Sequence, residues 1–452
     1  MINKKLLLVS ANVFAVPYPV YPLGLSYIAS YLSGKAPELE IRFFDFIVNG
    51  AENYINLLSE YKPDYIGISL RNVDDVNAYN RESFLQGYKT AVELSRRHSD
   101  AIITIGGSAY SIYPEYLFNL LEPDFAIYGE GEESFYQLLM SFESRTGFEQ
   151  IQGLVYKKAG ELQLNPRNNY FRTPELELND DLVDFYWQNS GMLSIQTKRG
   201  CPFSCIYCTY PLIEGKKVRT LEPDRIVKSL ERLYHDKGID YYFFTDSIFN
   251  IHDEFNYRLA EKIIQSGIKI KWGAYFSPYN MNEKLLALLK ESGLTHIEFG
   301  TDSISDSQLK NYRKSFTVKD VIEKSALCNK LDIYFAHFLI LGGIGETDDS
   351  IDETYSNSKL IDNTAFFPFI GMRIYPGTPL HKVAIEEGII SSDDKLLEPK
   401  YYISKKFDMD SLKEKAKQTG KKWVFPDEDL TDVMMKFRKK NKKGPLWEYI
   451  IS

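Results

Sequence analysis

Three closely spaced cysteines are the residues of this chain best suited to carry chemistry. Cys201, Cys205 and Cys208 are separated by three and two residues, in the sequence Cys-Pro-Phe-Ser-Cys-Ile-Tyr-Cys. A structural zinc site needs four protein ligands, and the nearest downstream histidine, His235, lies on a separate predicted helix. A [4Fe–4S] cluster fits three thiolates better, because three of its irons can be held while the fourth stays open to a substrate or cofactor.

The cysteine motif resembles the Cys-x3-Cys-x2-Cys signature of the radical S-adenosylmethionine (SAM) enzymes, including an aromatic residue, Tyr207, before the last cysteine. In that family the amino and carboxylate groups of SAM bind the open iron, and one-electron reduction cleaves SAM to a 5′-deoxyadenosyl radical. The resemblance continues through segments that end the predicted strands. It implies SAM contacts by Tyr207, Asp246, Ser247, Glu298, Asp302, Ser303, Arg313, Gly343, Glu346 and Tyr375.

Several of these implied contacts also have simpler interpretations. Arg313 stands where related enzymes pair a base with the SAM carboxylate, a role that suits a guanidinium group. Asp246 and Ser247 stand where a Gly-Gly-Glu is common, so the chain departs from the family pattern there. Taken singly, Gly343 also fits a plain turn, and Asp302 or Arg313 fits a surface charge.

Alternating strands and helices must position these residues. From residue 193 onward, six β-rich apolar runs alternate with helical patterns, which favours a (β/α)6 partial TIM barrel with its active site at the C-terminal strand ends. The predicted strands are 193–198, 241–245, 268–275, 296–300, 334–341 and 367–375, and the predicted helices are 223–236, 254–266, 282–292, 318–331 and 350–362.

Residues 1–158 alternate in the same way and predict an α/β domain with a doubly wound, Rossmann-like parallel sheet. The predicted strands are 5–10, 40–46, 64–70, 101–106 and 124–128, and the predicted helices are 24–33, 52–61, 82–98, 113–121 and 133–142. An α/β domain before a radical SAM barrel resembles the cobalamin-binding arrangement of the B12-dependent radical SAM enzymes. It implies cobalamin contacts by Ser10, Leu23, Leu70, Arg71, Asn72, Gly106, Gly107, Ser108, Gly129, Glu130 and Gly131.

The histidine content bears on how cobalamin would be held. The domain contains only His98, at a predicted helix end, and lacks the Asp-x-His-x-x-Gly motif that supplies a lower ligand in many cobalamin proteins. No histidine lower ligand is therefore expected, and Arg71 becomes the candidate residue under the cobalt. A guanidinium cannot donate a lone pair to a metal, and the tryptophan-methylating branch of the family places an arginine there. The alternatives are that Arg71 pairs with Asp74 or Asp75, or that the domain binds nothing.

Composition excludes other classes of protein. The 452 residues carry a net charge of −8 and lack an apolar run of membrane-spanning length. We therefore expect a monomeric cytoplasmic protein that binds neither nucleic acid nor membrane. Cys328, alone on a predicted helix, is interpreted as a core residue. Residues 159–192 predict a linker, 193–385 the barrel, and 386–452 a small, mainly helical region whose basic run is a solvated face or a contact surface.

The leading hypothesis is a cobalamin-dependent radical SAM methyltransferase. A methyl group would pass from SAM through methylcobalamin to a carbon of a small-molecule or natural-product substrate, by a radical or a polar route. The substrate would lie between the strand-end faces of the two domains, and flavodoxin or ferredoxin would supply electrons. The alternatives are a B12-dependent radical SAM enzyme without methyl transfer, such as a ring contractase or oxidative cyclase, and a cofactor-binding module without turnover.

Overall fold

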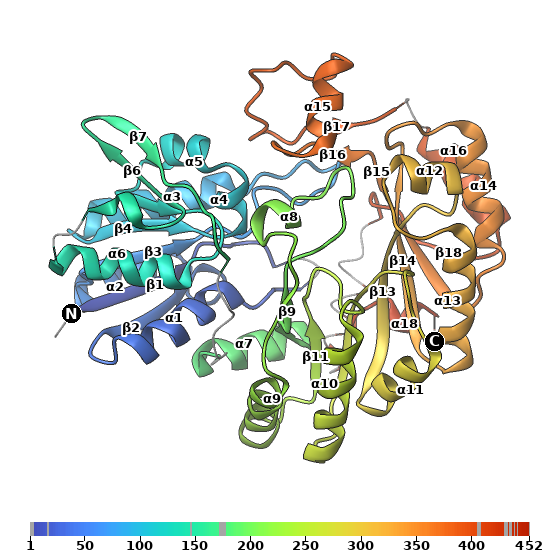
Figure 1. Cartoon of the computed structure of the whole chain (residues 1–452), viewed down its shortest axis with the longest axis horizontal. Coiled ribbons are helices and arrows are strands. Elements are labelled where there is room, and N and C mark those ends of the chain that lie inside the picture. The colour runs from blue at the N-terminus through green and yellow to red at the C-terminus, as the bar shows by residue number, and fades with distance from the viewer. Residues whose placement is uncertain are drawn as a thin grey trace. The chain divides into compact units, whose positions relative to one another are not determined.

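The computed structural model describes residues 4–15, 18–144, 147–170, 178–404, 408–428, 433, 436–437, 439–440 and 442–451. The chain divides into two compact units. Most of the first unit lies before Tyr186, and most of the second follows Trp187 (Figure 1). Within the described residues, the helices are all too short or too polar to cross a membrane.

The first unit is built on a seven-stranded sheet of order β2-β1-β3-β4-β5-β6-β7. Five strands are parallel: β1 (Lys5–Ser10), β2 (Glu40–Asp45), β3 (Tyr65–Ser69), β4 (Ile102–Gly106) and β5 (Phe125–Ile127). The hairpin β6 (Leu154–Lys158) and β7 (Glu161–Leu164) continues the sheet in antiparallel sense. The helices are α1 (Leu23–Lys35), α2 (Phe46–Tyr61), α3 (Leu85–His98), α4 (Ser108–Ile112), α5 (Pro114–Leu121), α6 (Glu132–Ser144) and α7 (Asp180–Ser190).

The order of the parallel strands places a switch point between β1 and β3. The apolar run Leu6–Val9 of β1 is fully buried, as expected for a parallel strand covered on both faces. On one face, Leu6 and Leu8 pack with Leu25 and Leu32 of α1 and with Leu138 of α6. Ligands of open α/β sheets bind at such switch points, outside the carboxyl ends of the strands.

The segment predicted as a linker contributes two ordered elements to the first unit. Strand β7 extends the sheet, and helix α7 contacts the carboxyl end of β2 through Tyr186. The Tyr186 hydroxyl donates to Asp45 at 2.8 Å, and Asp45 also caps α2 by accepting from the backbone N–H groups of Ile47 and Val48. The buried carboxylate of Asp45 therefore joins the end of β2, the start of α2 and helix α7.

The second unit contains a parallel sheet of order β18-β15-β14-β13-β12-β11-β8. Its strands are β8 (Leu193–Ile195), β11 (Tyr241–Phe244), β12 (Lys271–Phe276), β13 (Leu294–Asp302), β14 (Tyr334–Leu341), β15 (Thr364–Ile370) and β18 (Lys422–Trp423). The connecting helices are α9 (Pro223–Lys237), α10 (Asp253–Ser266), α11 (Glu283–Glu291), α12 (Asp306–Asn311), α13 (Val318–Lys330) and α14 (Asp348–Ser358). The 3-10 helix η1 (Phe148–Gln150) belongs to the first unit. The remaining elements of the chain are β9 (Lys198–Arg199), α8 (Tyr210–Ile213), β10 (Arg219–Thr220), β16 (Met372–Arg373), α15 (Pro379–Glu386), β17 (Tyr401–Tyr402), α16 (Met409–Gln418) and α18 (Glu448–Ile451).

The six longer strands of this sheet confirm the six β/α units of the predicted partial barrel. One face packs on helices, with the rings of Phe299, His337 and Phe366 stacked at centroid distances of 5.2 and 5.6 Å. His337 is a core histidine: Ser325 of α13 lies 3.1 Å from its Nε2, and burial lowers its pKa to about 3. Strand alternation turns His296 and Glu298 to the opposite face.

The C-terminal segment Gly444–Ile451 lies against this opposite face. Trp447 donates its indole N–H to Glu298 at 3.0 Å, and the Tyr241 hydroxyl donates to Glu448 at 2.8 Å. His296 Nδ1 lies 3.1 Å from the same Glu448 oxygen. The last residues of the chain therefore belong to the packed interior of the second unit, a role that their sequence did not predict.

Replacing Trp447 with Ala should destabilise the protein by about 3–5 kcal/mol, the usual cost of emptying a buried aromatic site. Trp447→Phe should cost less, because it keeps most of the packing and loses only the hydrogen bond to Glu298. Urea unfolding followed by circular dichroism measures both variants. A Trp447→Ala protein with wild-type stability would contradict the buried position of this segment.

Candidate functional site

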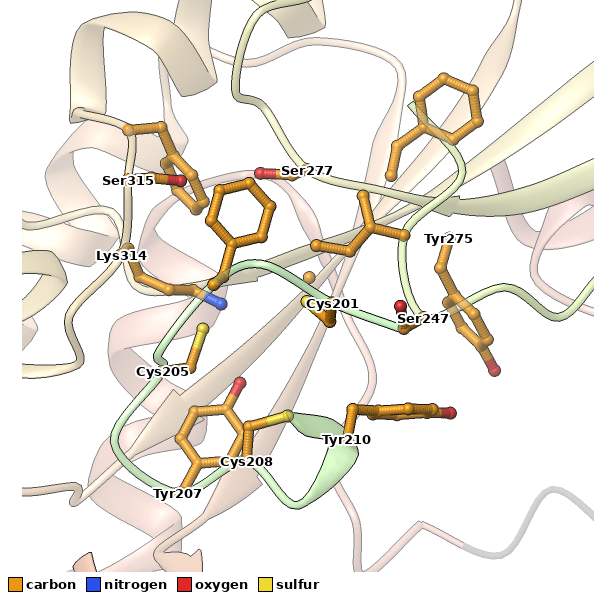
Figure 2. Close-up of a pocket in the computed structure, with 15 residues that line it drawn as sticks. Cys201, Cys205, Tyr207, Cys208, Tyr210, Ser247, Tyr275, Ser277, Lys314 and Ser315 are labelled. Carbon is orange, nitrogen blue, oxygen red and sulfur yellow. The ribbon is translucent and has the colours of Figure 1, made fainter. Parts of the chain in front are cut away.

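The three predicted cluster cysteines line one cavity of about 290 Å³ in the second unit. They lie on the loop after β9, and Figure 2 shows their side chains around the cavity. The backbone of Ile206 holds the loop in place with two hydrogen bonds. Its N–H donates to the Tyr312 carbonyl at 3.2 Å, and its carbonyl accepts from the Leu380 N–H at 2.9 Å. Aromatic and apolar side chains complete most of the wall: Phe203, Tyr207, Tyr210, Ile248, Tyr275, Phe276 and Phe316.

This arrangement fits a multi-iron cluster better than a single ion. Among the described residues, no three His, Cys, Asp or Glu side chains converge closely enough to share one metal ion. In a [4Fe–4S] cluster each thiolate binds a different iron, so the three sulfurs must surround a space. Burial raises the pKa of the Cys205 thiol and raises that of Cys208 to about 12, so iron must displace a proton from each.

A buried cation reaches the cavity beside the cysteines. Lys314 lines the cavity and pairs with Asp302 at 2.6 Å, and the Tyr207 hydroxyl donates to the same carboxylate oxygen at 2.5 Å. Arg313, the residue predicted to meet the SAM carboxylate, is exposed instead. The sequence predicted this role for Arg313 and not for the neighbouring Lys314, because a one-residue shift in the turn after α12 decides which side chain points inward.

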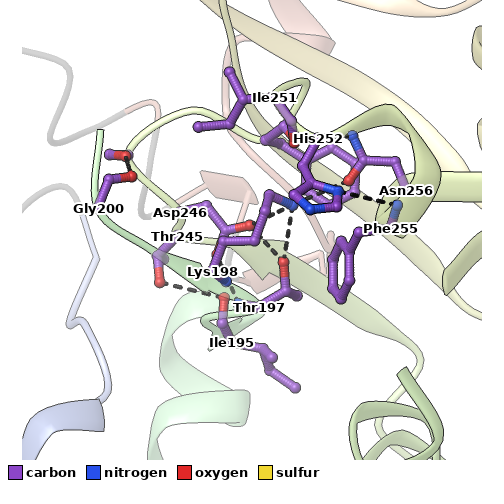
Figure 3. A network of polar contacts seen from close by, with 12 residues as sticks. Ile195, Thr197, Lys198, Gly200, Thr245, Asp246, Ile251, His252, Phe255 and Asn256 are labelled. Carbon is purple, nitrogen blue, oxygen red and sulfur yellow. Dashed lines mark hydrogen bonds and ion pairs between the residues drawn. The ribbon is translucent and has the colours of Figure 1, made fainter. Parts of the chain in front are cut away.

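Asp246 lies outside the cavity, in a buried network at the start of the cysteine loop (Figure 3). It accepts from the backbone N–H groups of Thr197 and Lys198 at 2.6 and 2.9 Å, and it pairs with the Lys198 ammonium at 3.0 Å. Lys198 also bonds Asn256 at 3.1 Å, and both charged side chains are 1% exposed. This network joins the strand before the cysteines to the end of β11, while the neighbouring Ser247 lines the cavity.

The other predicted SAM residues divide into cavity and non-cavity positions. Tyr207 and Ser247 line the cavity, and Asp302 reaches it through Lys314. Ser303 is buried and bonded to Thr354, and Glu298 is held by Trp447. The Tyr375 ring lies 4.9 Å from the Arg373 guanidinium carbon, and Gly343 packs so closely on Tyr312 that a side chain would collide with its hydroxyl.

The predicted cobalamin residues gather at the carboxyl ends of the first unit's strands. The loop after β3 is fixed from two sides: Ser108 donates to the Arg71 carbonyl at 2.9 Å, and the Tyr88 hydroxyl donates to the Asn72 carbonyl at 2.6 Å. Gly107 has φ +102°, and a side chain there would collide with the backbone of Leu70. Gly107 therefore lets the loops after β3 and β4 pack closely against each other at this edge of the sheet.

Arg71 extends from this fixed loop with an exposed side chain, and the described residues show no ion pair for it. His98 is at the other edge of the sheet, in a groove lined by Lys4, Asp64 and Ile102 at the strands' amino ends. Ser10 is buried at the end of β1, and Leu23 begins α1. The loop Gly129–Gly131 follows β5, and the Gly129 N–H donates to Ser111 at 2.8 Å.

Glu346 provides a pH test of this description. Its carboxylate accepts from the Gly342 N–H at 2.6 Å, and burial raises its pKa to about 7 from 4.5. The folded chain therefore binds this proton more tightly than the unfolded chain does. The protonated Glu346 contributes its full share to the free energy of unfolding below pH 4.5, and this contribution is lost as the pH rises through 7.

Glu346→Gln should remove this loss. Relative to the variant, the wild type should lose up to about 3 kcal/mol of unfolding free energy between pH 4.5 and pH 8. Urea titrations at several pH values measure the difference, and parallel stability curves for the two proteins would contradict it.

Comparison with known proteins agrees with these two units. The B12 binding domain family matches residues 9–139, and the Radical SAM superfamily matches residues 195–357. An uncharacterized methyltransferase of Pyrococcus horikoshii is 25% identical over 82% of this chain and 79% of its own length. The anaerobic magnesium-protoporphyrin IX monomethyl ester cyclase of Cereibacter sphaeroides is 24% identical over 74% of this chain and 55% of its own length.

Among solved structures, the radical SAM methyltransferase TsrM of Kitasatospora setae, with tryptophan and a SAM analogue bound, superposes with a TM-score of 0.85 at 19% identity. The superposition covers 99% of this chain and 97% of TsrM. The same fold therefore extends over both units. The chain therefore joins a B12 binding domain to a radical SAM domain, the domain combination of the cobalamin-dependent radical SAM enzymes.

Proposed function

We propose that this protein is a methyltransferase that moves a methyl group from SAM to a carbon of a small-molecule substrate. The observation that carries the proposal is the cavity in which three cysteines and Lys314 meet, in a chain that also has a B12 binding domain. When bound, the cluster supplies an electron to SAM and the corrinoid carries the methyl group. Methyltransferases among the relatives support the transfer of a methyl group.

The residues around the cavity bind and orient SAM. Lys314 has three N–H donors and uses one on Asp302, so it can also donate to the carboxylate of SAM. One carboxylate oxygen of Asp302 accepts from both Tyr207 and Lys314, and this holds Lys314 in place. Burial of Lys314 and Asp302 strengthens this charge pairing, and the apolar side chains around them would help to keep water from a reactive radical.

Arg71 supports a corrinoid bound without a histidine lower ligand. Its backbone is fixed by Ser108, its side chain is exposed, and His98 is at the opposite edge of the same sheet. A guanidinium beneath the cobalt would leave that face without a lone-pair donor. This position of Arg71 is compatible with the polar route of methyl transfer as well as with the radical route.

A second candidate is a B12-dependent radical SAM enzyme that transfers no methyl group, favoured by the cyclase relative of Cereibacter sphaeroides. The two candidates share every residue named above. Formation of S-adenosylhomocysteine from SAM by the purified protein separates them, because only methyl transfer leaves that product. For both, we propose flavodoxin or ferredoxin as the electron donor.

Anaerobic reconstitution with iron, sulfide and hydroxocobalamin tests the cofactor set. The wild type should take up about four iron atoms and one cobalt per chain. Cys205→Ala should lose most of the iron and all SAM turnover, because one corner of the cluster is no longer held. Cys328→Ala, which changes a fully buried cysteine on α13, is the matched control and should keep its iron. Full iron content in Cys205→Ala would contradict the assignment.

Lys314→Met should weaken SAM binding about 10- to 100-fold, the loss expected when a charge-assisted hydrogen bond is removed. Equilibrium dialysis with the reconstituted protein measures the dissociation constant. Arg313→Met tests the competing residue and should have little effect, as should Lys310→Met on the exposed face of α12. Weaker binding in Arg313→Met with normal binding in Lys314→Met would reverse the assignment.

A further inference from the structure

The segment immediately after β7 is fixed to the loop that precedes β6. The Asn165 N–H donates to the Leu154 carbonyl at 2.9 Å. Its side-chain amide donates to the carbonyls of Phe148 and Ile151 at 2.6 and 2.9 Å. Two residues farther on, this support places Arg167 against the loop after β5, where the predicted cobalamin contacts Gly129, Glu130 and Gly131 lie.

Arg167 connects to that loop through two nitrogens of its guanidinium group, Nε and Nη2. Its Nε donates to the Tyr128 carbonyl at 3.0 Å, and its Nη2 donates to the Glu130 carbonyl at 2.7 Å. The same Nη2 lies 3.2 Å from Ser134 Oγ and 3.4 Å from the Gln152 carbonyl. One side chain therefore fixes the loop on both sides of Gly129 and ties it to the start of α6.

Two glycines make room for this guanidinium. A Cβ on Gly129 would lie 2.6 Å from Arg167 Nε, and a Cβ on Gly153 would lie 2.5 Å from Nη2. Both glycines also have positive φ, at +76° and +70°. Any side chain at either position would push against Arg167, so the glycines and the arginine form one interdependent unit.

Two carbonyls of this loop have Arg167 as their hydrogen-bond donor. The carbonyls of Tyr128 and Glu130 face the guanidinium, and the Gly129 N–H is taken by Ser111. Burial lowers the pKa of Arg167, but the Glu130 carboxylate favours its charged form. Arg167 is half-buried, and a cation that satisfies several carbonyls at once is costly to remove, because each carbonyl would lose its partner.

We propose that Arg167 is a positioning residue for cobalamin: it holds the Gly129–Gly131 loop in the conformation that receives the corrinoid. The inference rests on the proposed function, in which this loop contacts cobalamin. It assigns a binding role to a segment that the sequence predicted to be a linker. Arg167 acts through the loop and need not touch the cofactor itself.

Hydroxocobalamin binding to the full-length protein tests this role without any assay of turnover. Protein purified without cobalamin is titrated with hydroxocobalamin, and the bound fraction is measured by absorbance after rapid desalting. Arg167→Met should raise the dissociation constant about 10- to 100-fold. Arg167→Lys should recover part of the affinity, because it keeps the charge but cannot reach the Tyr128 and Glu130 carbonyls together.

Arg96→Met is the matched control. Arg96 lies in the same unit and pairs with Asp124 at 2.9 Å on an exposed surface, so this variant should bind hydroxocobalamin like the wild type. If circular dichroism shows that Arg167→Met is unfolded, Ser134→Ala replaces it. That variant removes one Arg167 contact and should raise the dissociation constant about 2- to 5-fold.

The outcomes separate the two proposals. A folded Arg167→Met protein with the wild-type dissociation constant would overturn the role of Arg167 and leave the proposed function intact. In the Ser134→Ala fallback, an unchanged constant would overturn it equally. A wild-type protein that binds no hydroxocobalamin would overturn the proposed function, and the role of Arg167 with it.

Discussion

Buried charges must be paired, and two buried lysine–aspartate pairs govern the cysteine-bearing loop. Lys198 and Asp246 fix the start of the loop against the end of β11, with side chains that are 1% exposed. Lys314 lines the cavity and pairs with Asp302, and their side chains are 8% and 7% exposed. Breaking either pair would leave an uncompensated charge in a low-dielectric interior, which costs several kcal/mol. The Lys198–Asp246 pair only stabilises the fold, whereas Lys314 lines the cavity and has N–H donors left for a ligand.

The parallel sheets explain why such distant residues meet. Every parallel strand directs its carboxyl end to the same edge, so loops far apart in the sequence converge there. In the second unit this edge gathers the cysteine loop, Ser247, Gly300 and Lys314 around one cavity. In the first unit the same rule gathers the loops after β3, β4 and β5. Arg167 shows that a segment after the last strand can complete that edge.

The sequence predicted strands and cofactor classes better than the destination of individual charges. The run Tyr334–Leu341 forms β14 with the predicted bounds because it is apolar and continuous. The last long strand runs from Thr364 to Ile370 and not from 367 to 375 as predicted, and it pairs with β14 over this whole length, Pro368 included. Asp246 and Arg313 could not be placed from motif position, because burial of Asp246 by Lys198 and exposure of Arg313 depend on tertiary contacts.

The central claim is that three thiolates hold a cluster whose open iron faces the SAM-binding cavity. Electron paramagnetic resonance of the reduced, reconstituted protein tests it most directly, with and without SAM that carries 17O in its carboxylate. We expect SAM to shift the cluster signal and the 17O nucleus to couple to it. An unshifted signal without 17O coupling, at a SAM concentration that saturates the protein, would contradict the account.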